Sequence, residues 1–311
     1  MQIHSSLNDY SGSSPVITMG TFDGVHPGHK ALLEKVKELA VAGHTESLVI
    51  TFWPHPRQVL LQDAEKLRLL TTLEEKTKLI SETGIDHLMV LPFTAELAAL
   101  TAQNFTENIL VNKLHVKHLV TGFNHKFGKG GITFKELTEL SRKHNFKLTQ
   151  FRHIDVNGDH PSSTKIRHLL LEGNIEGANH LLGYSYAISG TVIGGQRLGR
   201  TIAYPTANVL LQERSKLVPP DGVYACRVKV TGKLFYGMVN IGIRPTVNHQ
   251  MDHRSIEVHI LDFHRDIYSE EIVVFFEKRI RDEMKFSGID TLKEQLQKDE
   301  IIIRQILTRT K

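Results

Sequence analysis

The chain has 311 residues, of which 40% are hydrophobic and 23% charged, and its 38 basic and 34 acidic side chains give a formal net charge of +4. This composition excludes a disordered or low-complexity protein, and the length exceeds what one compact core usually holds, so two domains are expected. The basic residues form neither a long run nor a stripe interleaved with aromatics, so no nucleic-acid partner is expected.

Cysteine content and hydropathy bear on where the protein works. Cys226 is the only cysteine, which excludes an intrachain disulfide and a cysteine-based zinc site. Its neighbours are typical of a strand, and the thiol is expected to be inert. No apolar stretch approaches the roughly 18 residues of a membrane-spanning helix, and residues 1–10 lack the order of a signal peptide. We therefore expect a cytoplasmic protein with no membrane partner.

From residue 15 to about 151, short apolar runs alternate with helical patterns. A capping sequence at 72–75 begins one helix, and another is expected to end near Leu114. Strands that are apolar on both faces and alternate with helices predict a Rossmann-like α/β domain with a buried parallel sheet. The apolar runs are 16–19, 48–52, 88–91 and 118–121.

After Gly183 the pattern changes to short runs separated by glycine and proline turns, which predicts a mainly antiparallel β-barrel. Since helix gives way to strand there, the predicted domains are residues 1–183 and 184–311, and the second is expected to fold alone. The runs are 186–192, 223–230, 234–241, 256–261 and 272–276. A terminal helix is expected to cover the barrel with Leu292, Leu296, Ile302 and Ile306.

The first apolar run leads into a glycine-containing loop that ends with His26 and His29. Pro27 suits the first turn of a helix, so backbone amides and the positive end of that helix would face a bound phosphate. The alternative is that these are two of 18 histidines that happen to flank a turn. Their place at the carboxyl end of the first strand, where α/β proteins bind ligands, favours a phosphate site.

A second polar cluster opens the last helix of this half. Ser163 and Thr164 lie at the helix cap and Arg167 about one turn further on, an arrangement that can clamp a triphosphate. As a capping sequence alone it is common, so a purely structural role is the alternative.

Together these segments resemble the nucleotidyltransferases that carry an H-x-G-H signature at the first helix and S-T-x-x-R at the last. Within them the match is to the FAD synthetase half of the bacterial bifunctional riboflavin kinase/FMN adenylyltransferases, through residues 22–29, 51–56, 122–128 and 162–167. The resemblance implies adenylyl transfer from ATP to FMN, with His26 and His29 catalytic and with His55 and Pro56 near the flavin. The ATP site that it implies consists of Phe22, Asp23, His26, His29, Asn124, Ser163, Thr164 and Arg167.

Two positions depart from that family's pattern. His125 stands where relatives usually have an aromatic residue, and Gly131 stands where many have arginine. Both bear on substrate affinity more than on the type of reaction.

In the second half, residues 190–200 are rich in glycine, which by itself is as often an ordinary barrel turn. Thr206 and Asn208 alternate on an extended segment and so can point the same way. A hydroxyl and an amide oxygen suit Mg²⁺ that holds nucleotide phosphates. Glu257 lies on its strand opposite the apolar face, where a single carboxylate is usually just solvent-exposed.

This half resembles the riboflavin kinase domain in residues 190–200, 205–208, 221–224, 240–246, 257–259 and 281–286. The resemblance implies that Thr206 and Asn208 bind magnesium and ATP, that Glu257 takes the proton of the ribityl 5′-hydroxyl, and that Arg281 lies near the flavin. Ala203 and Tyr204 replace a common glycine and phenylalanine, a conservative change. The loop residues implied to cover the ATP phosphates are Gly194, Gly195, Gly199 and Arg200.

The expected function is a bifunctional enzyme that makes FMN from riboflavin in the barrel and FAD from FMN in the α/β domain, using ATP with Mg²⁺ in each step. Its partners are then riboflavin, FMN and ATP, and its oligomeric state is not predicted. One alternative is an enzyme in which only the kinase half is fully active. Another is a flavin- or nucleotide-binding regulator without turnover, for which loss of His29 or Glu257 would be expected, although both are present.

Overall fold

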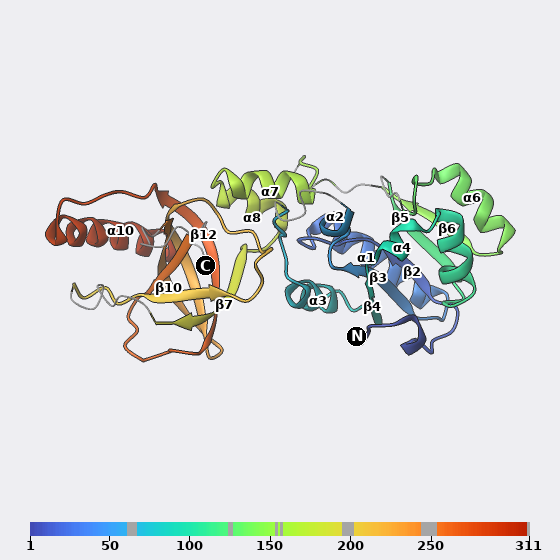
Figure 1. Ribbon diagram of the computed structural model, residues 1–311, viewed down its shortest axis with the longest axis horizontal. Helices are drawn as coiled ribbons and strands as arrows, with labels where there is room; N and C mark the ends of the chain where they lie inside the picture. Colours follow the sequence, from blue (N-terminus) through green and yellow to red (C-terminus); the bar gives the residue numbers. More distant parts are fainter. Residues whose placement is uncertain are drawn as a thin grey trace. The chain divides into compact units, whose positions relative to one another are not determined.

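The computed structural model describes residues 1–60, 67–123, 127–152, 155, 158–194, 202–243 and 254–309. The chain divides into two compact units, Met1–Ser163 and Thr164–Lys311, and each is described by itself. The first holds a parallel sheet and the second a closed antiparallel barrel, so the predicted fold class is confirmed (Figure 1).

A six-stranded parallel sheet forms the centre of the first unit. Its order is β1-β4-β3-β2-β5-β6, so β2 lies between β3 and β5. The strands are β1 (Gln2–His4), β2 (Val16–Met19), β3 (Ser47–Trp53), β4 (His87–Pro92), β5 (His118–Gly122) and β6 (Lys147–Phe151). Parallel neighbours need crossover connections, which here are helical.

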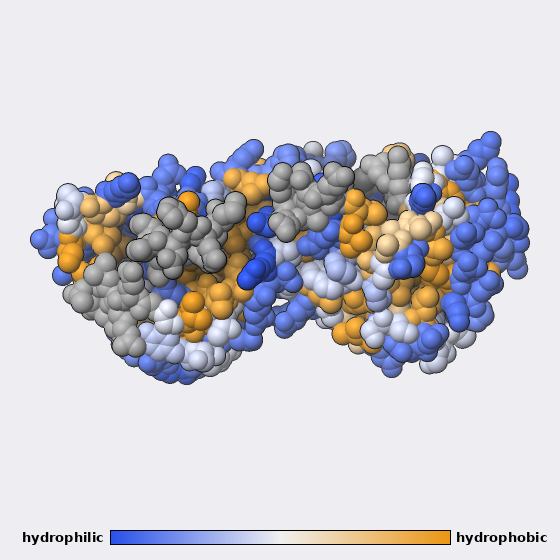
Figure 2. All heavy atoms as spheres, in the orientation of Figure 1, coloured by the Kyte–Doolittle hydropathy of each residue, from blue (hydrophilic) through white to orange (hydrophobic). Residues whose placement is uncertain are grey.

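Helices connect these strands. They are η1 (Leu7–Asp9), α1 (Pro27–Ala42), α2 (Pro56–Leu60), α3 (Leu73–Ser81), α4 (Ala95–Ala99), α5 (Ala102–Phe105), the π-helix η3 (Thr106–Val111) and α6 (Phe134–Lys143). The predicted cap of α3 is confirmed: the Thr72 hydroxyl accepts from the Glu75 backbone N–H at 3.2 Å, and the Glu75 carboxylate accepts from the Thr72 N–H at 3.0 Å. The solvent side of α6 is polar (Figure 2).

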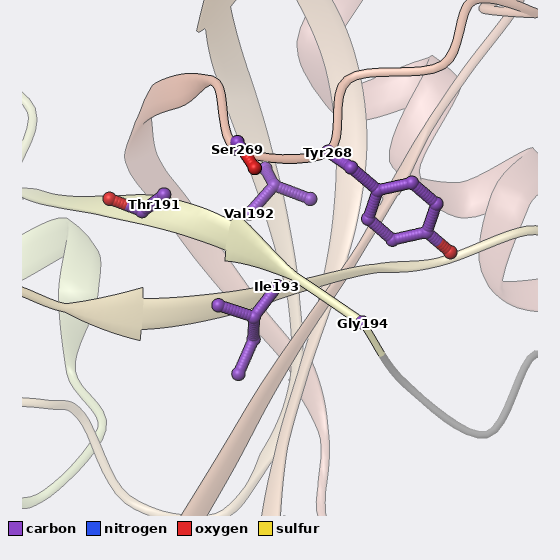
Figure 3. A pocket seen from close by; sticks show the side chains of 6 residues that line it. All are labelled: Thr191, Val192, Ile193, Gly194, Tyr268 and Ser269. Carbon is purple, nitrogen blue, oxygen red and sulfur yellow. The ribbon is translucent and has the colours of Figure 1, made fainter.

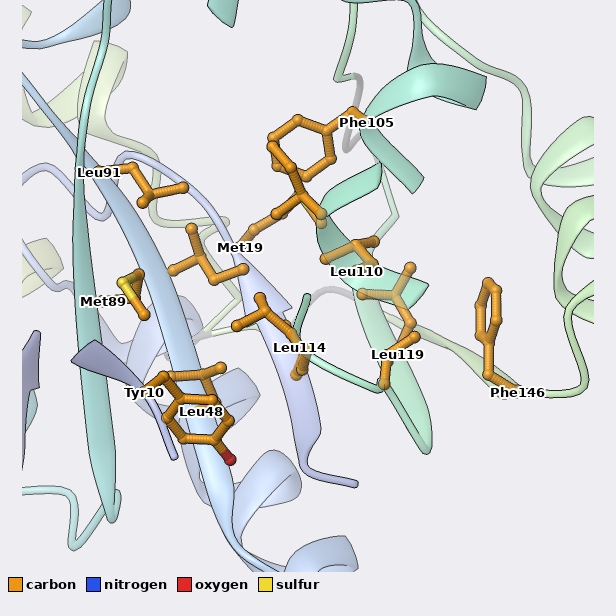
Figure 4. Packing of buried hydrophobic residues seen from close by; sticks show 14 of the residues in the cluster. Tyr10, Met19, Leu48, Met89, Leu91, Phe105, Leu110, Leu114, Leu119 and Phe146 are labelled. Atoms are coloured by element: carbon orange, nitrogen blue, oxygen red, sulfur yellow. The ribbon is translucent and has the colours of Figure 1, made fainter. Parts of the chain in front are cut away.

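Alternate residues of the central strands pack on opposite faces of the sheet. Met19, Leu48 and Met89 face Phe105 and Leu110 in one buried cluster (Figure 4). Their strand neighbours point to the other face, where a second cluster includes Val49, Leu88 and, from α1, Leu33 and Val36. Burial on both faces explains why these strands are continuous apolar runs in the sequence.

The second unit is built on a closed barrel with the strand order β10-β11-β8-β7-β12-β9. Its strands are β7 (Ala187–Ile193), β8 (Ala207–Leu211), β9 (Gly222–Val230), β10 (Lys233–Ile243), β11 (Arg254–Ile260) and β12 (Glu271–Arg281). The helices among its described residues are α7 (Ser163–Leu171, whose first residue belongs to the first unit), α8 (Ile175–Leu182) and α10 (Ile289–Arg309). Cys226 is buried in β9, and burial raises the pKa of its thiol well above the usual value, in keeping with an inert cysteine.

Helix α8 packs on the barrel. Gly183 ends the helix in the left-handed conformation at φ 73°, as predicted for a helix-terminating glycine. The Asn179 side chain donates to the Phe276 carbonyl at 2.8 Å and accepts from the Tyr186 N–H at 2.7 Å. Leu181 and Leu182 are fully buried. Helix α8 is therefore hydrogen-bonded both to β12 and to the residue that precedes β7.

These contacts predict how two fragments of the chain will behave. Residues 184–311 are expected to fold and to make FMN from riboflavin but no FAD. Residues 164–311 retain the Asn179 hydrogen bonds and the buried leucines of α8, so this fragment should melt roughly 5 to 10 °C higher. Thermal unfolding and riboflavin turnover of the two purified fragments test this. Equal melting temperatures would show that α8 adds nothing to the barrel.

The terminal helix α10 covers the barrel as predicted, but the prediction that Ile302 faces inward is wrong. Ile302 is 43% exposed, whereas Ile303 is fully buried. Ile303 lies seven residues after Leu296, which is close to two helical turns, so it shares that residue's face and Ile302 does not. In the described part of the chain, no helix is long and apolar enough to cross a membrane.

Candidate active sites

The loop between β2 and α1 brings His26 and His29 together. Pro27 opens α1, with His26 at the N-cap, and the two imidazole rings stack with centroids 3.7 Å apart and planes 19° from parallel. The loop reaches this geometry through positive φ angles at Phe22 (46°) and Val25 (33°). Non-glycine residues adopt such angles at a cost, and they persist where the surrounding structure enforces them, often at functional sites.

The environment keeps His29 neutral. Burial lowers its pKa well below the ordinary 6.5, and the nearby His26 and Lys76 lower it further. The Phe22 ring lies edge-on at 5.3 Å. Among the described residues, His29 Nδ1 is buried without a hydrogen-bond partner. A buried nitrogen in that state is an unsatisfied group that a ligand can satisfy.

Asp23 holds the loop in place. One of its carboxylate oxygens accepts from the backbone N–H groups of Leu70 and Thr71, at 2.9 and 3.1 Å, and from the Thr71 hydroxyl at 3.3 Å. The Ser163 hydroxyl donates to the Asp23 carbonyl at 2.8 Å, so the second predicted cluster begins at the same loop. Thr164 and Arg167 follow within α7, in the second compact unit.

Removal of the Asp23 carboxylate should therefore destabilise the first unit. Asp23→Ala leaves two buried N–H groups without their acceptor, which should lower the free energy of unfolding by about 2 to 5 kcal/mol. Asp23→Asn keeps an oxygen in the same place and should lose much less. Denaturant unfolding of both variants measures the difference. Equal losses would show that charge, and not the acceptor geometry, is what matters.

Two further predicted segments follow β3 and β5, the strands on either side of β2. His55 comes after β3 and is buried, and its Nδ1 accepts from the Arg57 N–H at 3.1 Å, while Pro56 begins α2. Asn124 and His125 come after β5 but lie outside the described residues. Gly131 has a φ of 73°, a conformation that favours glycine, which explains why a glycine suits this chain there.

On the barrel, Thr206, Asn208 and Glu257 come together. Asn208 of β8 lies directly opposite Glu257 of β11, and the Thr206 hydroxyl donates to the Glu257 carboxylate at 3.2 Å. Directly opposite residues in paired strands project to the same face. A hydroxyl, an amide and a carboxylate thus share one patch, as the alternation in sequence predicted for the first two.

The start of the glycine loop lies next to this patch. Ile193, the last residue of β7, is paired with Asn208, and Gly194 follows it. Gly194 borders an open pocket of 410 Å³ that is also lined by Tyr268 and Ser269 (Figure 3). Gly195, Gly199 and Arg200 lie outside the described residues.

Arg281, predicted to lie near the flavin, ends β12 and is engaged within the protein. Its guanidinium pairs with the buried Asp299 of α10 at 2.8 Å, and another of its nitrogens donates to the Asp282 carbonyl at 2.9 Å. The guanidinium lies 5.8 Å from the centre of the Phe286 ring. A flavin contact of Arg281 stays a prediction.

Lys76 was not singled out from the sequence. Its side chain is only 2% exposed, which is unusual for a lysine. Its spacing could have indicated this burial. Lys76 lies three residues after Leu73 and four before Ile80, so the three share the inner face of α3.

Comparisons with known proteins agree for both units. Residues 10–165 match the FAD synthetase family model and residues 182–307 match the riboflavin kinase model. The bifunctional riboflavin kinase/FMN adenylyltransferase of Listeria monocytogenes is 40% identical, over 95% of this chain and 93% of its own. The Escherichia coli protein of the same name is also 40% identical, over 95% and 94%.

A solved structure agrees in fold. The crystal structure of a macrolide-efflux protein from Streptococcus pneumoniae has a TM-score of 0.88 and 30% identity, with 97% of this chain and 98% of that chain covered. The two family matches follow the order of the two units, and the relatives are covered over more than nine tenths of their length. The chain belongs to the family of bifunctional riboflavin kinase/FMN adenylyltransferases.

Proposed function

We propose that this chain phosphorylates riboflavin to FMN at the barrel site and transfers AMP from ATP to FMN at the α/β site, working in the cytoplasm. The domains are residues 184–311 for the first step and 1–183 for the second. The observation that carries the proposal is that each unit gathers its own set of predicted polar residues: stacked His26 and His29 in one, Thr206 with Glu257 in the other. The names of the relatives give both activities for those proteins.

In the kinase step, Glu257 acts as the base. It takes the proton of the ribityl 5′-hydroxyl while that oxygen forms a bond to the γ-phosphorus of ATP, and ADP leaves with the bridging oxygen. The 3.2 Å contact from Thr206 orients the Glu257 carboxylate. Gly194, which borders the pocket that Tyr268 lines, begins the glycine-rich segment that is proposed to bind the ATP phosphates.

The oxygen donors at Thr206 and Asn208 fit Mg²⁺. Magnesium prefers oxygen ligands and is usually held by one or two protein groups together with substrate phosphates. The described residues contain no group of three or more metal-ligating His, Cys, Asp or Glu side chains. When bound with ATP, the ion would neutralise developing phosphate charge.

In the adenylyl step, an FMN phosphate oxygen attacks the α-phosphorus of ATP and pyrophosphate leaves, with no net proton transfer. The protein's part is to position the reactants and to stabilise negative charge. His26, His29 and the amino end of α1 face the ATP phosphates, Phe22 and Asp23 shape the loop, and Asn124, Ser163, Thr164 and Arg167 complete the ATP site. His55 and Pro56 border the flavin.

Chromatography of a reaction with riboflavin, ATP and Mg²⁺ tests the proposal. FMN and FAD should both appear, with FAD accumulating after FMN. FMN alone would show that only the kinase half is active. This is the outcome that the departures at His125 and Gly131 from the family's pattern would explain. Neither product would favour a binding protein without turnover.

A further inference from the structure

The side chain of Lys76 is an unusual feature of the α/β unit. Lysine is almost never fully buried unless its charge is paired. Lys76 is 2% exposed, and its ammonium has one hydrogen-bond acceptor among the described residues, the Thr51 hydroxyl at 3.5 Å. The ammonium also lies 5.6 Å from the centre of the Trp53 ring. Two of its three N–H donors thus have no acceptor in the described part of the chain.

The surroundings of Lys76 connect it to the loop between β2 and α1 that carries His26 and His29. Thr51 donates to the carbonyl of Thr21, which precedes Phe22 in that loop, at 3.4 Å. The charge of Lys76 is close enough to lower the pKa of His29, and the charge of Asp23 acts on Lys76 in turn. Among the described residues no ion pair joins Asp23 to Lys76, and one oxygen of Asp23 accepts from the Leu70 and Thr71 N–H groups. Lys76 therefore brings a cation to the edge of the sheet where His29 is neutral.

A structural role explains this arrangement poorly. Burying an ammonium is costly unless a partner compensates for the lost water, and a single hydroxyl at 3.5 Å compensates weakly. A phosphoryl oxygen would supply the missing acceptor and the opposite charge. We propose that Lys76 is a phosphate-binding residue of the FMN adenylyltransferase site and supplies positive charge to the reacting phosphates, an inference that rests on the proposed function.

The main test compares Lys76→Met with Lys78→Met, an exposed lysine on the same helix. Lys76→Met should lower kcat/KM for FMN adenylylation by about 100-fold to 1000-fold, the range for loss of one preorganised charge-stabilising group. Lys78→Met should stay near the parent value, and riboflavin phosphorylation should be unchanged in both. A parent protein that makes no FAD would refute the proposed function. A parent that makes FAD with an equally fast Lys76→Met variant would refute the role of Lys76 alone.

Stability separates a binding role from a structural one. Methionine fills a similar volume and carries no charge to bury, so Lys76→Met should melt at the parent temperature or above it. A lower melting temperature together with a loss of both activities would show that Lys76 supports the fold, and would overturn the inference. Lys76→Arg retains the charge and should recover part of the adenylylation rate.

The pH profile gives a further readout. Burial lowers the pKa of Lys76 to about 8. The cation is the active form, so kcat/KM for adenylylation in the parent should fall as pH rises through about 8. That decline should be missing in Lys76→Met and should move to higher pH in Lys76→Arg. His26, His29 and Asp23 are the other titratable groups at this loop, and His29 is already neutral at this pH. An unchanged alkaline decline in Lys76→Met would show that Lys76 does not cause it and would contradict the inference.

Trp53 identifies which phosphate is bound, because it is the only tryptophan in the chain. ATP, FMN and riboflavin are titrated separately while Trp53 fluorescence is followed. Weaker ATP binding in Lys76→Met would assign the lysine to the ATP phosphates. A lost preference for FMN over riboflavin would assign it to the FMN phosphate. Unchanged binding of all three would overturn the inference.

Discussion

Glu257→Gln is expected to slow riboflavin phosphorylation by about two to four orders of magnitude while ATP still binds. Glutamine keeps the shape of the side chain and can still accept from Thr206, but it cannot take the proton of the attacking hydroxyl. FMN supplied directly should still become FAD, because Glu257 lies on the barrel and His26 and His29 on the other unit.

The matched control is Glu271→Gln, which removes an exposed carboxylate from β12 of the same barrel. It should phosphorylate riboflavin at the parent rate. Initial rates of FMN formation for the two variants give the comparison. A Glu257→Gln protein that works at nearly the parent rate would show that Glu257 is not the base.

His29→Ala is expected to lower FAD formation by about two to three orders of magnitude, as for the loss of one preorganised group that stabilises charge in the transition state. FMN formation should persist. The exposed His180 of α8 gives a control, since His180→Ala should leave both activities at parent level. Equal falls in FMN and FAD formation after loss of His29 would show that the two sites are not separate.

His29 also predicts a pH dependence of stability. Its pKa in the folded protein lies well below 6.5, so the unfolded chain binds a proton there first as the pH falls. The stability that neutral His29 provides is present above about pH 6.5 and is lost as the pH drops below it. His29→Ala should weaken this acid destabilisation. Unfolding free energies of the parent and the variant between about pH 7 and pH 5 would measure the change.

The sequence predicted the architecture well where local signals agree with the final packing. Buried strands such as β3 are apolar throughout, the cap at Thr72 and Glu75 is local, and Gly183 ends α8 through its own backbone conformation. The residues of the first loop that are proposed to bind phosphate were recognisable because Pro27 and the glycines indicate where α1 begins. Each of these features depends on a few residues that are close together in the sequence, so it can be predicted from the sequence.

Features that depend on distant contacts were missed. Lys76 was not singled out, because its burial depends on Thr51 and Trp53, which belong to β3 and not to its own helix. Ile302 was assigned to the inner face of α10 because hydrophobicity alone cannot distinguish it from the adjacent Ile303. The sequence placed α8 before the predicted domain boundary at Gly183. The hydrogen bonds of Asn179 with Phe276 and Tyr186 show that α8 packs on the barrel instead.

We propose that two separate sites on one chain act in sequence through free FMN. The most direct measurement mixes the Glu257→Gln and His29→Ala proteins with riboflavin, ATP and Mg²⁺ and follows FAD by chromatography. Alone, the first variant should make almost no FMN, and the second should make FMN but almost no FAD. Together they should produce FAD at a rate approaching that of the parent. A mixture that makes no more FAD than the two variants make separately would show that the two sites do not act through free FMN.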